Sequence, residues 1–434
     1  MHRSLLLATL TLFPVLIFAR DLESKPADPY FARYEGWKAP QPSALLLKKG
    51  DRLAICGDSI TEQKMYSLLM EAYLTACLPE LEVTCRQYGW SGEQAGGFLR
   101  RMKNDVLRFK PTIATTCYGM NDHRYEPYKE EIGTEYRKNQ TAVVEVFKQA
   151  GVRVVLGSPG TISTVPGWVK NTSGTWEDLN NSLCKLRNID IEIAEAKGEH
   201  FADVFWPMLQ ASFTAEQKYG QEFDVAGDDG VHPGWAGQVI MASAFLHALG
   251  IDGRIGTLTV DMAAGKAQAD AGHTVRGFAN GKLDVTSARW PFCAAPGPLD
   301  KDNSIRAGMA LCQFDERFNR LVLKVSGLTA AKATITWGKE TKTFTREQLA
   351  AGINLAAEFQ TNPFSDSFTG LWDAVRQKQE FETKQIKQIF HGAEGKKDME
   401  AAVAATEKER APLAEAIRAS LRPVEHSVVI APVP

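Results

Sequence analysis

The first half of this 434-residue chain alternates short apolar runs with longer segments in which apolar residues recur at helical spacing. Strands that alternate with helices predict right-handed crossovers and a parallel sheet covered by helices on both faces. The expected strands are 51–56, 81–87, 112–117, 152–157 and 200–204, and the expected helices are 65–78, 95–109, 130–150, 179–197 and 235–249. We therefore expect an α/β fold, whose ligands bind outside the carboxyl ends of the strands.

Three short segments at or near these strand ends carry the residue types of serine ester chemistry. They are Gly57-Asp58-Ser59, Gly119-Met120-Asn121-Asp122 and Asp229-Gly230-Val231-His232. A serine nucleophile needs a base to take its proton, a carboxylate to orient that base, and hydrogen-bond donors for the oxyanion. Ser59, His232 and Asp229 would fill the first three roles. Each segment alone is weak evidence, but their combination predicts a serine hydrolase.

These motifs resemble the sequence blocks of the SGNH, or GDSL-type, hydrolase family over roughly residues 49–249. Gly57-Asp58-Ser59 matches the first block, Tyr88-Gly89-Trp90-Ser91-Gly92 the second, the segment with Asn121 the third, and Asp229-x-x-His232 the fourth. The resemblance implies a flavodoxin-like sheet and an oxyanion hole made by the backbone N–H groups of Ser59 and Gly92 and the amide of Asn121.

The chain departs from the family pattern at one position and offers one competing carboxylate. Gln87 stands where the family usually has Asn, a change that concerns loop geometry more than chemistry. Asp228 has the wrong spacing to His232 for the family pattern, so Asp229 is the expected triad member.

Composition and patterning divide the chain into five segments. Residues 1–19 combine a basic start with a short apolar run, which predicts a signal peptide and export to the periplasm or outside the cell, although Ile17 leaves a retained anchor as an alternative. A 20–48 extension precedes the 49–252 catalytic domain. Alternating apolar stretches such as 321–325 and 333–337 then predict a β-rich accessory module over 253–360, and 361–434 is expected to be helical.

The seven cysteines fit an exported protein with one or two disulfides, for which Cys77 with Cys85, and Cys293 with Cys312, are candidate pairs. The net charge of −2 favours neither nucleic acid nor an anionic membrane as a partner. No His, Cys and Asp residues show metal spacing, so we expect neither a metal nor a cofactor. The oligomeric state is left open.

The substrate is expected to be an acetyl or other short-chain ester of a carbohydrate. Besides Asp58 in the first motif, candidate substrate-binding residues are Trp90, His123, Arg124 and Tyr125, because aromatic faces suit sugar rings and a guanidinium suits an anionic sugar. A lipase or thioesterase, and acyl transfer to a sugar, would use the same nucleophile. The alternative that is not an enzyme is a glycan-binding protein with a hydrolase fold.

Overall fold

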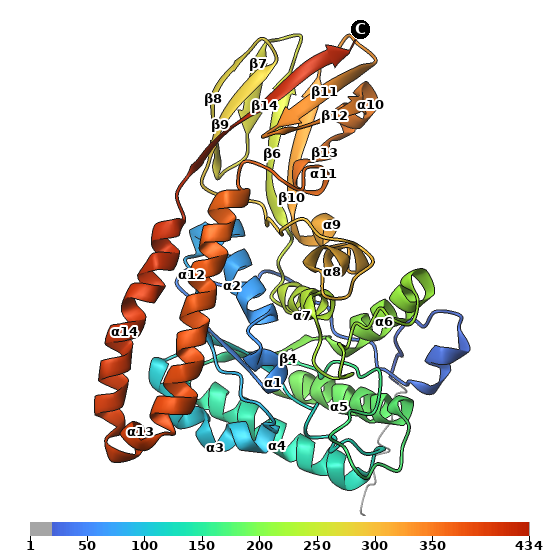
Figure 1. The fold of residues 1–434 in the computed structure, drawn as a ribbon, viewed down its shortest axis with the longest axis vertical. Helices are drawn as coiled ribbons and strands as arrows, with labels where there is room; N and C mark the ends of the chain where they lie inside the picture. Colours follow the sequence, from blue (N-terminus) through green and yellow to red (C-terminus); the bar gives the residue numbers. More distant parts are fainter. Residues whose placement is uncertain (1–19, 434) are drawn as a thin grey trace, which may run out of the picture.

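A parallel sheet forms the base of the molecule, in the strand order β2-β1-β3-β4-β5 (Figure 1). The computed structural model describes residues 20–433. The sheet strands are β1 (Arg52–Gly57), β2 (Thr84–Gln87), β3 (Ile113–Cys117), β4 (Arg153–Gly157) and β5 (His200–Ala202). This order confirms the predicted flavodoxin-like α/β fold. The chain reverses its winding direction between β1 and β3, and such a switch point is where open sheets bind ligands.

Helices cover both faces of this sheet because β1 alternates its side chains between two cores. Leu53 and Ile55 pack with α2 (Tyr66–Cys77) and α7 (Trp235–Ala248), whereas Ala54 and Cys56 pack on the opposite face. That face is covered by α3 (Ala95–Asp105), α4 (Glu130–Gln149) and α5 (Trp176–Lys197). The short helices of this part are η1 (Pro29–Arg33), α1 (Ser59–Glu62), η2 (Pro79–Leu81) and η3 (Leu107–Phe109).

One helix of the α/β part was not expected from the sequence. It is α6 (Phe205–Tyr219), which follows β5 directly. Pro207 lies in its first turn and resembles a helix breaker, but proline is tolerated there because those N–H groups have no partner within the helix.

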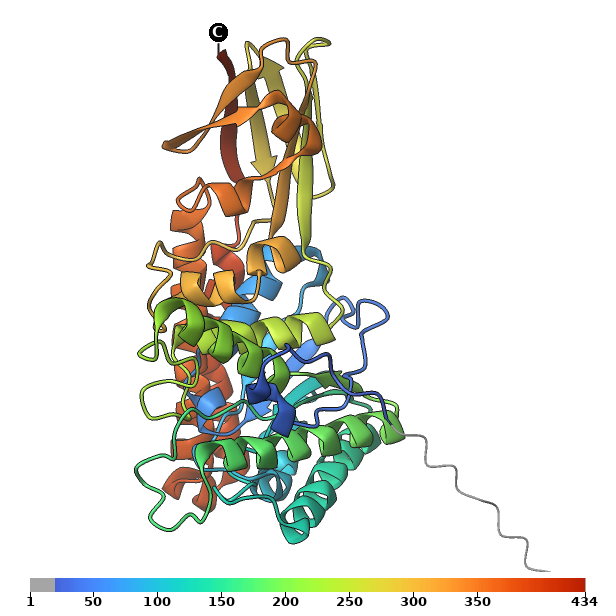
Figure 2. The same ribbon diagram turned by 90° about the vertical axis from the view of Figure 1, so that its right-hand side faces the viewer.

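The β-rich part lies beyond the helices, at the far end of the molecule (Figures 1 and 2). One of its sheets has the order β13-β10-β6-β7 and the other the order β12-β11-β14-β9-β8. The strands are β6 (Arg254–Asp261), β7 (Lys266–Ala269), β8 (His273–Ala279), β9 (Lys282–Ser287), β10 (Arg320–Ser326), β11 (Lys332–Trp337), β12 (Glu340–Thr345) and β13 (Ile353–Asn354). The helices among them are α8 (Ile305–Leu311), α9 (Phe314–Phe318), α10 (Arg346–Ala351) and α11 (Leu355–Glu358).

The last seventy residues form a helical hairpin that returns to the β-rich part. Helix α12 (Ser365–Lys384) runs along the flank of the α/β part and continues as the π-helical turn η4 (Gln385–Phe390). After α13 (Ala393–Lys397), helix α14 (Met399–Ser420) runs back beside α12 (Figure 1). The chain then ends in β14 (Val424–Val433), which pairs with β11 and β9. The expectation of an entirely helical 361–434 segment was wrong, because this strand completes the middle of a sheet.

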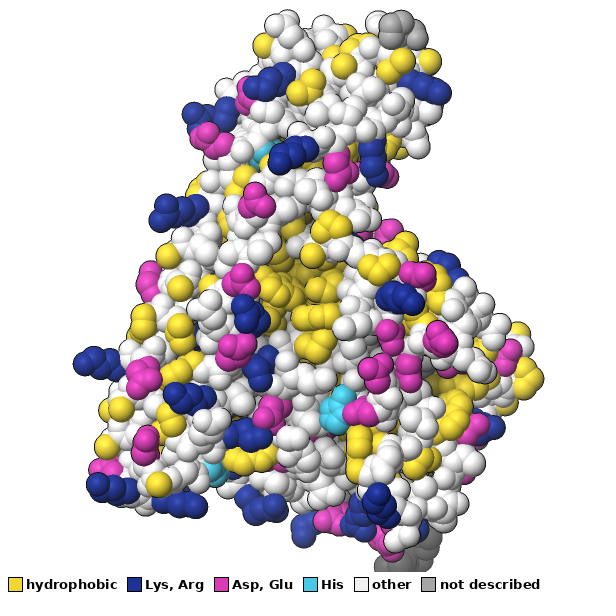
Figure 3. Space-filling model, viewed as in Figure 1, with side chains coloured by type: hydrophobic (Ala, Val, Ile, Leu, Met, Phe, Trp, Pro, Cys, Tyr) yellow, Lys and Arg dark blue, Asp and Glu magenta, His cyan; other side chains and the backbone are white. Residues whose placement is uncertain are grey.

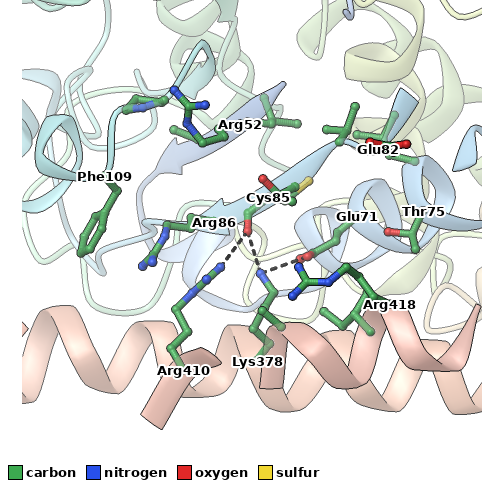
Figure 4. A pocket seen from close by; sticks show the side chains of 18 of the residues that line it. Arg52, Glu71, Thr75, Glu82, Cys85, Arg86, Phe109, Lys378, Arg410 and Arg418 are labelled. Atoms are coloured by element: carbon green, nitrogen blue, oxygen red, sulfur yellow. Dashed lines mark hydrogen bonds and ion pairs between the residues drawn. The ribbon is translucent and has the colours of Figure 1, made fainter. Parts of the chain in front are cut away.

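The helical hairpin covers the exposed edge of β2. Lys378 Nζ donates to Cys85 O at 2.7 Å, and Arg410 donates to the same carbonyl at 3.3 Å (Figure 4). Gln87 N donates to Glu382 at 3.1 Å. These bonds satisfy backbone groups that an edge strand otherwise leaves unpaired. A cavity of about 590 Å³ remains between the strand edge and the two helices.

All seven cysteines lie in the described part of the chain, and each is a free thiol. The expected disulfides, Cys77 with Cys85 and Cys293 with Cys312, are therefore not formed in this structure. Burial raises the pKa of the Cys77 and Cys85 thiols well above the ordinary value. These side chains act as small apolar packing residues.

The predicted signal peptide, 1–19, lies outside the described residues. Within 20–433, none of the helices combines the length and the apolar character that crossing a bilayer requires. The 20–48 segment packs on the α/β part, where Arg187 of α5 binds Glu23 and the carbonyl of Trp37. On the face shown in Figure 3, hydrophobic side chains gather in a hollow below the β-rich part, and charges of both signs are scattered elsewhere.

Candidate active site

Ser59 lies where the first sheet strand ends and a short helix begins. Asp58 is the N-cap of α1, and its carboxylate accepts the N–H of Ile60 at 3.0 Å. Ser59 is therefore the first residue of a helix, whose leading N–H groups have no partner within the helix. A serine in this position offers both its hydroxyl and a backbone donor to a ligand at the edge of the sheet.

His232 and Asp229 reach this serine from the loop that precedes α7. His232 Nε2 lies 2.7 Å from Ser59 Oγ, and His232 Nδ1 lies 2.7 Å from Asp229 Oδ2. The other carboxylate oxygen of Asp229 accepts the backbone N–H groups of Val231 and His232. Burial raises the pKa of Asp229, but the hydrogen bonds from His232 and Val231 outweigh this effect and hold the pKa below its ordinary value. Asp228 is exposed and takes no part in this chain of hydrogen bonds.

The loops that carry the expected oxyanion donors contact the residues just before Ser59: Trp90 N donates to Gly57 O at 3.0 Å, and Asn121 donates to Asp58. Gly92 has a φ of +73°, a left-handed conformation that favours glycine, yet an added Cβ would meet no atom within 4 Å. Backbone conformation, and not lack of space, is therefore the reason for glycine at this position. Asn121 Nδ2 makes long hydrogen bonds, 3.3 Å to Asp58 and 3.2 Å to the carbonyl of Glu93. The same amide could turn to a developing oxyanion, because apo-state hydrogen bonds of this length often rearrange on binding.

Asp122 anchors the segment that carries Asn121. Its carboxylate accepts the N–H of Gly119 and the N–H of Ala95 at the start of α3, each at 3.0 Å. Burial raises the pKa of Asp122 to about 7. These bonds fix the loop after β3 against the next helix, and hence fix the backbone on which Asn121 stands.

The predicted substrate-binding residues fall into different environments. His123 is fully buried, with Nδ1 2.5 Å from the carbonyl of Met120, so the expectation that it contacts substrate is corrected: its ring packs in the core. Asp58 is also buried and holds Ile60 and Asn121 in place. Arg124 is exposed and forms an ion pair with Glu135 of α4. Trp90 is half-buried against the C-terminal helices, where its ring centroid lies 4.9 Å from that of His391.

Tyr125 lies at the rim of the site in a strained stretch of backbone. Arg124 and Tyr125 have φ values of +56° and +55°, which side chains other than glycine seldom adopt. Such backbone conformations persist only where the surrounding structure enforces them, and they cluster at functional sites. The Tyr125 ring lies between His123 and Trp168, at centroid distances of 4.7 Å and 6.2 Å.

Trp168 is a site residue that the sequence reasoning missed. Its ring centroid is 5.8 Å from that of His232, and 47% of the residue is exposed, unusual for a large apolar side chain. The loop that carries it is attached to the Asp229 segment, because Ser163 N donates to Gly230 O at 3.1 Å. The available signal was its position: this loop follows β4, at the ligand-binding edge of the sheet.

The comparisons with known proteins indicate which class of enzyme has this fold. Residues 55–240 match the GDSL-like lipase/acylhydrolase family. Through this segment, which is less than half of the chain, the protein is similar to GDSL-type, or SGNH, hydrolases, and it is an ester-bond hydrolase.

Two relatives illustrate how far the similarity extends. The acetylxylan esterase of Geobacillus stearothermophilus is 26% identical over 225 residues, which are 47% of this chain and 95% of that protein. Its crystal structure aligns with 48% of this chain and 97% of its own at 23% identity, with a TM-score of 0.40.

A gut microbial diltiazem-metabolizing enzyme aligns over 90% of this chain and 100% of its own, with 22% identity and a TM-score of 0.73. The fold as a whole, including parts beyond the hydrolase domain, therefore recurs in another protein.

Proposed function

We propose that this protein is a serine esterase that removes acetyl or other short acyl groups from a carbohydrate, with Ser59, His232 and Asp229 as its catalytic triad. The observation that carries the proposal is the continuous chain of hydrogen bonds from Ser59 Oγ through the His232 ring to Asp229, with both links at 2.7 Å. A nucleophile bonded to a base that is itself oriented by a third group is the arrangement that covalent ester hydrolysis requires.

In the proposed reaction, Ser59 Oγ attacks the acyl carbon while His232 Nε2 takes its proton. Asp229 holds the imidazole in the tautomer with the proton on Nδ1 and stabilises the imidazolium. The backbone N–H groups of Ser59 and Gly92 and the amide of Asn121 bind the oxyanion. His232 then returns the proton to the departing alcohol, and water, activated by the same base, releases the acid from the acyl enzyme.

A carbohydrate ester is supported by the aromatic rim of the site. Trp168 presents an exposed indole beside His232, and Tyr125 lies next to it. Large, flat and partly exposed rings suit the apolar faces of sugars, because they bury area without loss of flexible rotamers. That a relative is an acetylxylan esterase supports the same choice.

One observation favours a second candidate, an esterase or thioesterase for a longer or more apolar acyl group. Trp235, three residues beyond His232, contacts Trp372 of α12 with ring centroids 5.6 Å apart. Hydrophobic side chains also gather in the hollow on the same face as α7 and α12 (Figure 3). Exposed apolar patches often mark binding sites.

The same residues would serve acyl transfer to a sugar, in which a sugar hydroxyl takes the place of water in releasing the acyl group from Ser59.

We also propose that the protein is exported, on the evidence of its basic start and the short apolar run 4–19.

The proposal is tested by hydrolysis of p-nitrophenyl esters of different chain length, followed by release of acetate from acetylated polysaccharides. Ser59→Ala, prepared in the same way, serves as the blank. Acetate release by the natural chain and none by the variant is the expected result. Equal release by both would overturn the triad, and cleavage of esters without acetate release from any glycan would overturn the carbohydrate substrate.

A further inference from the structure

The loop that carries Gly92 is in direct contact with the helix that carries Ser59. Ser91 N donates to a carboxylate oxygen of Glu62, the last residue of α1, at 2.5 Å. The approach is so close that a Cβ on Gly89 would lie 2.2 Å from Glu62 N, which explains the glycine at this position. Glu62 thus connects α1, the helix that begins at Ser59, to Ser91, the residue before Gly92.

The carboxylate of Glu62 is held by a residue more than three hundred positions away. Lys387 Nζ lies 2.7 Å and 2.8 Å from the two oxygens of Glu62. The Glu62 and Lys387 side chains are 21% and 26% exposed, so water screens this pair less than an open surface pair. Lys387 Nζ also lies 5.2 Å from the ring centroid of Trp90, in the same loop as Gly92.

Lys387 lies in an unusual piece of helix that is firmly attached to the sheet. Residues Gln385–Phe390 form a π-helical turn, a rare feature that often occurs at functional sites. The preceding helix is attached to the edge of β2 by Lys378, whose Nζ donates to Cys85 O (Figure 4). After the turn, His391 contacts both Trp90 and the buried Asp105. The loop that carries Trp90 and Gly92 therefore packs against a segment that is itself hydrogen-bonded to the α/β part.

We propose that Lys387 is a positioning residue for the oxyanion hole, acting through Glu62. It holds Glu62 where the carboxylate fixes Ser91 N, and with it the neighbouring N–H of Gly92. It also neutralises a carboxylate that would otherwise oppose the negative charge developing close by. This inference rests on the proposed serine esterase function and assigns the C-terminal helical hairpin a part in it.

The effect should fall on the transition state, because the oxyanion exists only there. Lys387→Met should lower kcat by about tenfold to a hundredfold, less than the roughly 10²–10³ that loss of a whole donor costs. KM for p-nitrophenyl acetate should change by less than about twofold, since the ground-state ester does not need the oxyanion donors. Lys387→Arg keeps the charge and should retain most of the activity.

A double-mutant cycle separates this role from a loss of folding. Glu62→Gln keeps an acceptor for Ser91 N without the charge, so its kcat should fall less than that of Lys387→Met. In the Glu62→Gln background, Lys387→Met should have little further effect on kcat. Lys384→Met is the matched control, because Lys384 is exposed one turn earlier and makes no ion pair among the described residues. Its kcat should equal that of the natural chain.

The outcomes distinguish this inference from the function on which it rests. If Ser59→Ala loses activity while Lys387→Met keeps the natural kcat, the positioning role is wrong and the esterase stands. If Ser59→Ala retains activity, the proposed function itself fails. Independent, additive effects of Glu62→Gln and Lys387→Met would also refute the positioning role. Should Lys387→Met not fold, Glu62→Asp decides instead: the shortened carboxylate must lower kcat.

Discussion

His232 Nε2 lies 2.7 Å from Ser59 Oγ although 173 residues separate them in the chain. The contact is set by the docking of α7, which begins just after His232. Gln238 of that helix is fully buried, accepts the N–H of Tyr66 at 3.1 Å and donates to Gln63 at 2.8 Å. The helix that follows His232 is thus hydrogen-bonded to the segment that follows Ser59, which holds the two loops together.

Replacing the nucleophile should abolish ester hydrolysis without unfolding the protein. Ser59→Ala removes the attacking oxygen, and alanine fits the first turn of a helix. His232→Ala should be equally severe, and Asp229→Asn milder because the base remains. Initial rates on p-nitrophenyl acetate, with circular dichroism as the check on folding, measure this. Asp228→Asn, at the exposed neighbour, is the control; more than a few per cent of activity in Ser59→Ala would contradict the assignment.

Removing the exposed indole should weaken binding of carbohydrate esters only. Trp168→Ala should raise KM for acetylated oligosaccharides by about threefold to tenfold, the range expected for loss of an aromatic contact of roughly 0.5–1.5 kcal/mol. Its kcat on p-nitrophenyl acetate should stay within about twofold. Leu45→Ala removes another exposed apolar side chain, in the N-terminal extension, and should change neither value. An equal loss on both substrates would mean that Trp168 only supports His232.

The acyl side of the site should prefer acetyl groups. We expect kcat/KM to fall from the acetate to the octanoate ester of p-nitrophenol. An apolar acyl channel would instead add about 0.8 kcal/mol of binding for each methylene group. A steep rise of kcat/KM toward the octanoate would favour the second candidate function, in which Trp235 and Trp372 would line the acyl site. Trp372→Ala should then reverse that rise. The triad assignment would stand in either case.

Stability should decline in acid because buried histidines stay neutral in the folded protein. Burial lowers the pKa of His426 from 6.5 to about 4, and His426 bonds to Ser287 Oγ and to the indole N–H of Trp337. Below pH 6.5 the unfolded chain binds a proton that the folded chain excludes, so the free energy of unfolding falls between pH 6.5 and about 4. For one such group the loss is roughly 3 kcal/mol.

Urea unfolding at a series of pH values measures how the free energy of unfolding depends on pH. His426→Asn should show a shallower decline over the same range, because the replacement cannot bind the proton. A natural chain whose stability is flat from pH 6.5 to 4 would contradict the prediction.

Local patterns in the sequence were sufficient to predict the parallel sheet and to recognise the motifs. The strand at β1 and the helix at α2 follow from residues close together in the chain, because apolar periodicity reports which side of an element is buried. Each motif also has a local cause, such as the turn between β1 and α1 that Asp58 caps. The β-rich part was recognised in the same way, from alternation over 321–325 and 333–337.

The features that the sequence did not reveal depend on distant partners. The strand β14 has the alternation of its type, but only its pairing with β11 and β9 places it in the middle of a sheet. Cys77 and Cys85 are close in sequence, yet their environments keep both as buried thiols. His123 lies beside Asn121 in the chain, and its burial reflects how the loop after β3 folds back.

The sequence by itself determined the class of fold, the strands of the parallel sheet and the identity of the three groups in the proposed triad, because strand periodicity and short motifs depend on residues close together in the chain. Only the tertiary structure decided that Trp168 borders His232 and that Lys387 reaches Glu62. These contacts join loops and helices that no local pattern relates. They arise when the sheet and the helical hairpin pack, since packing brings together side chains that are far apart along the chain.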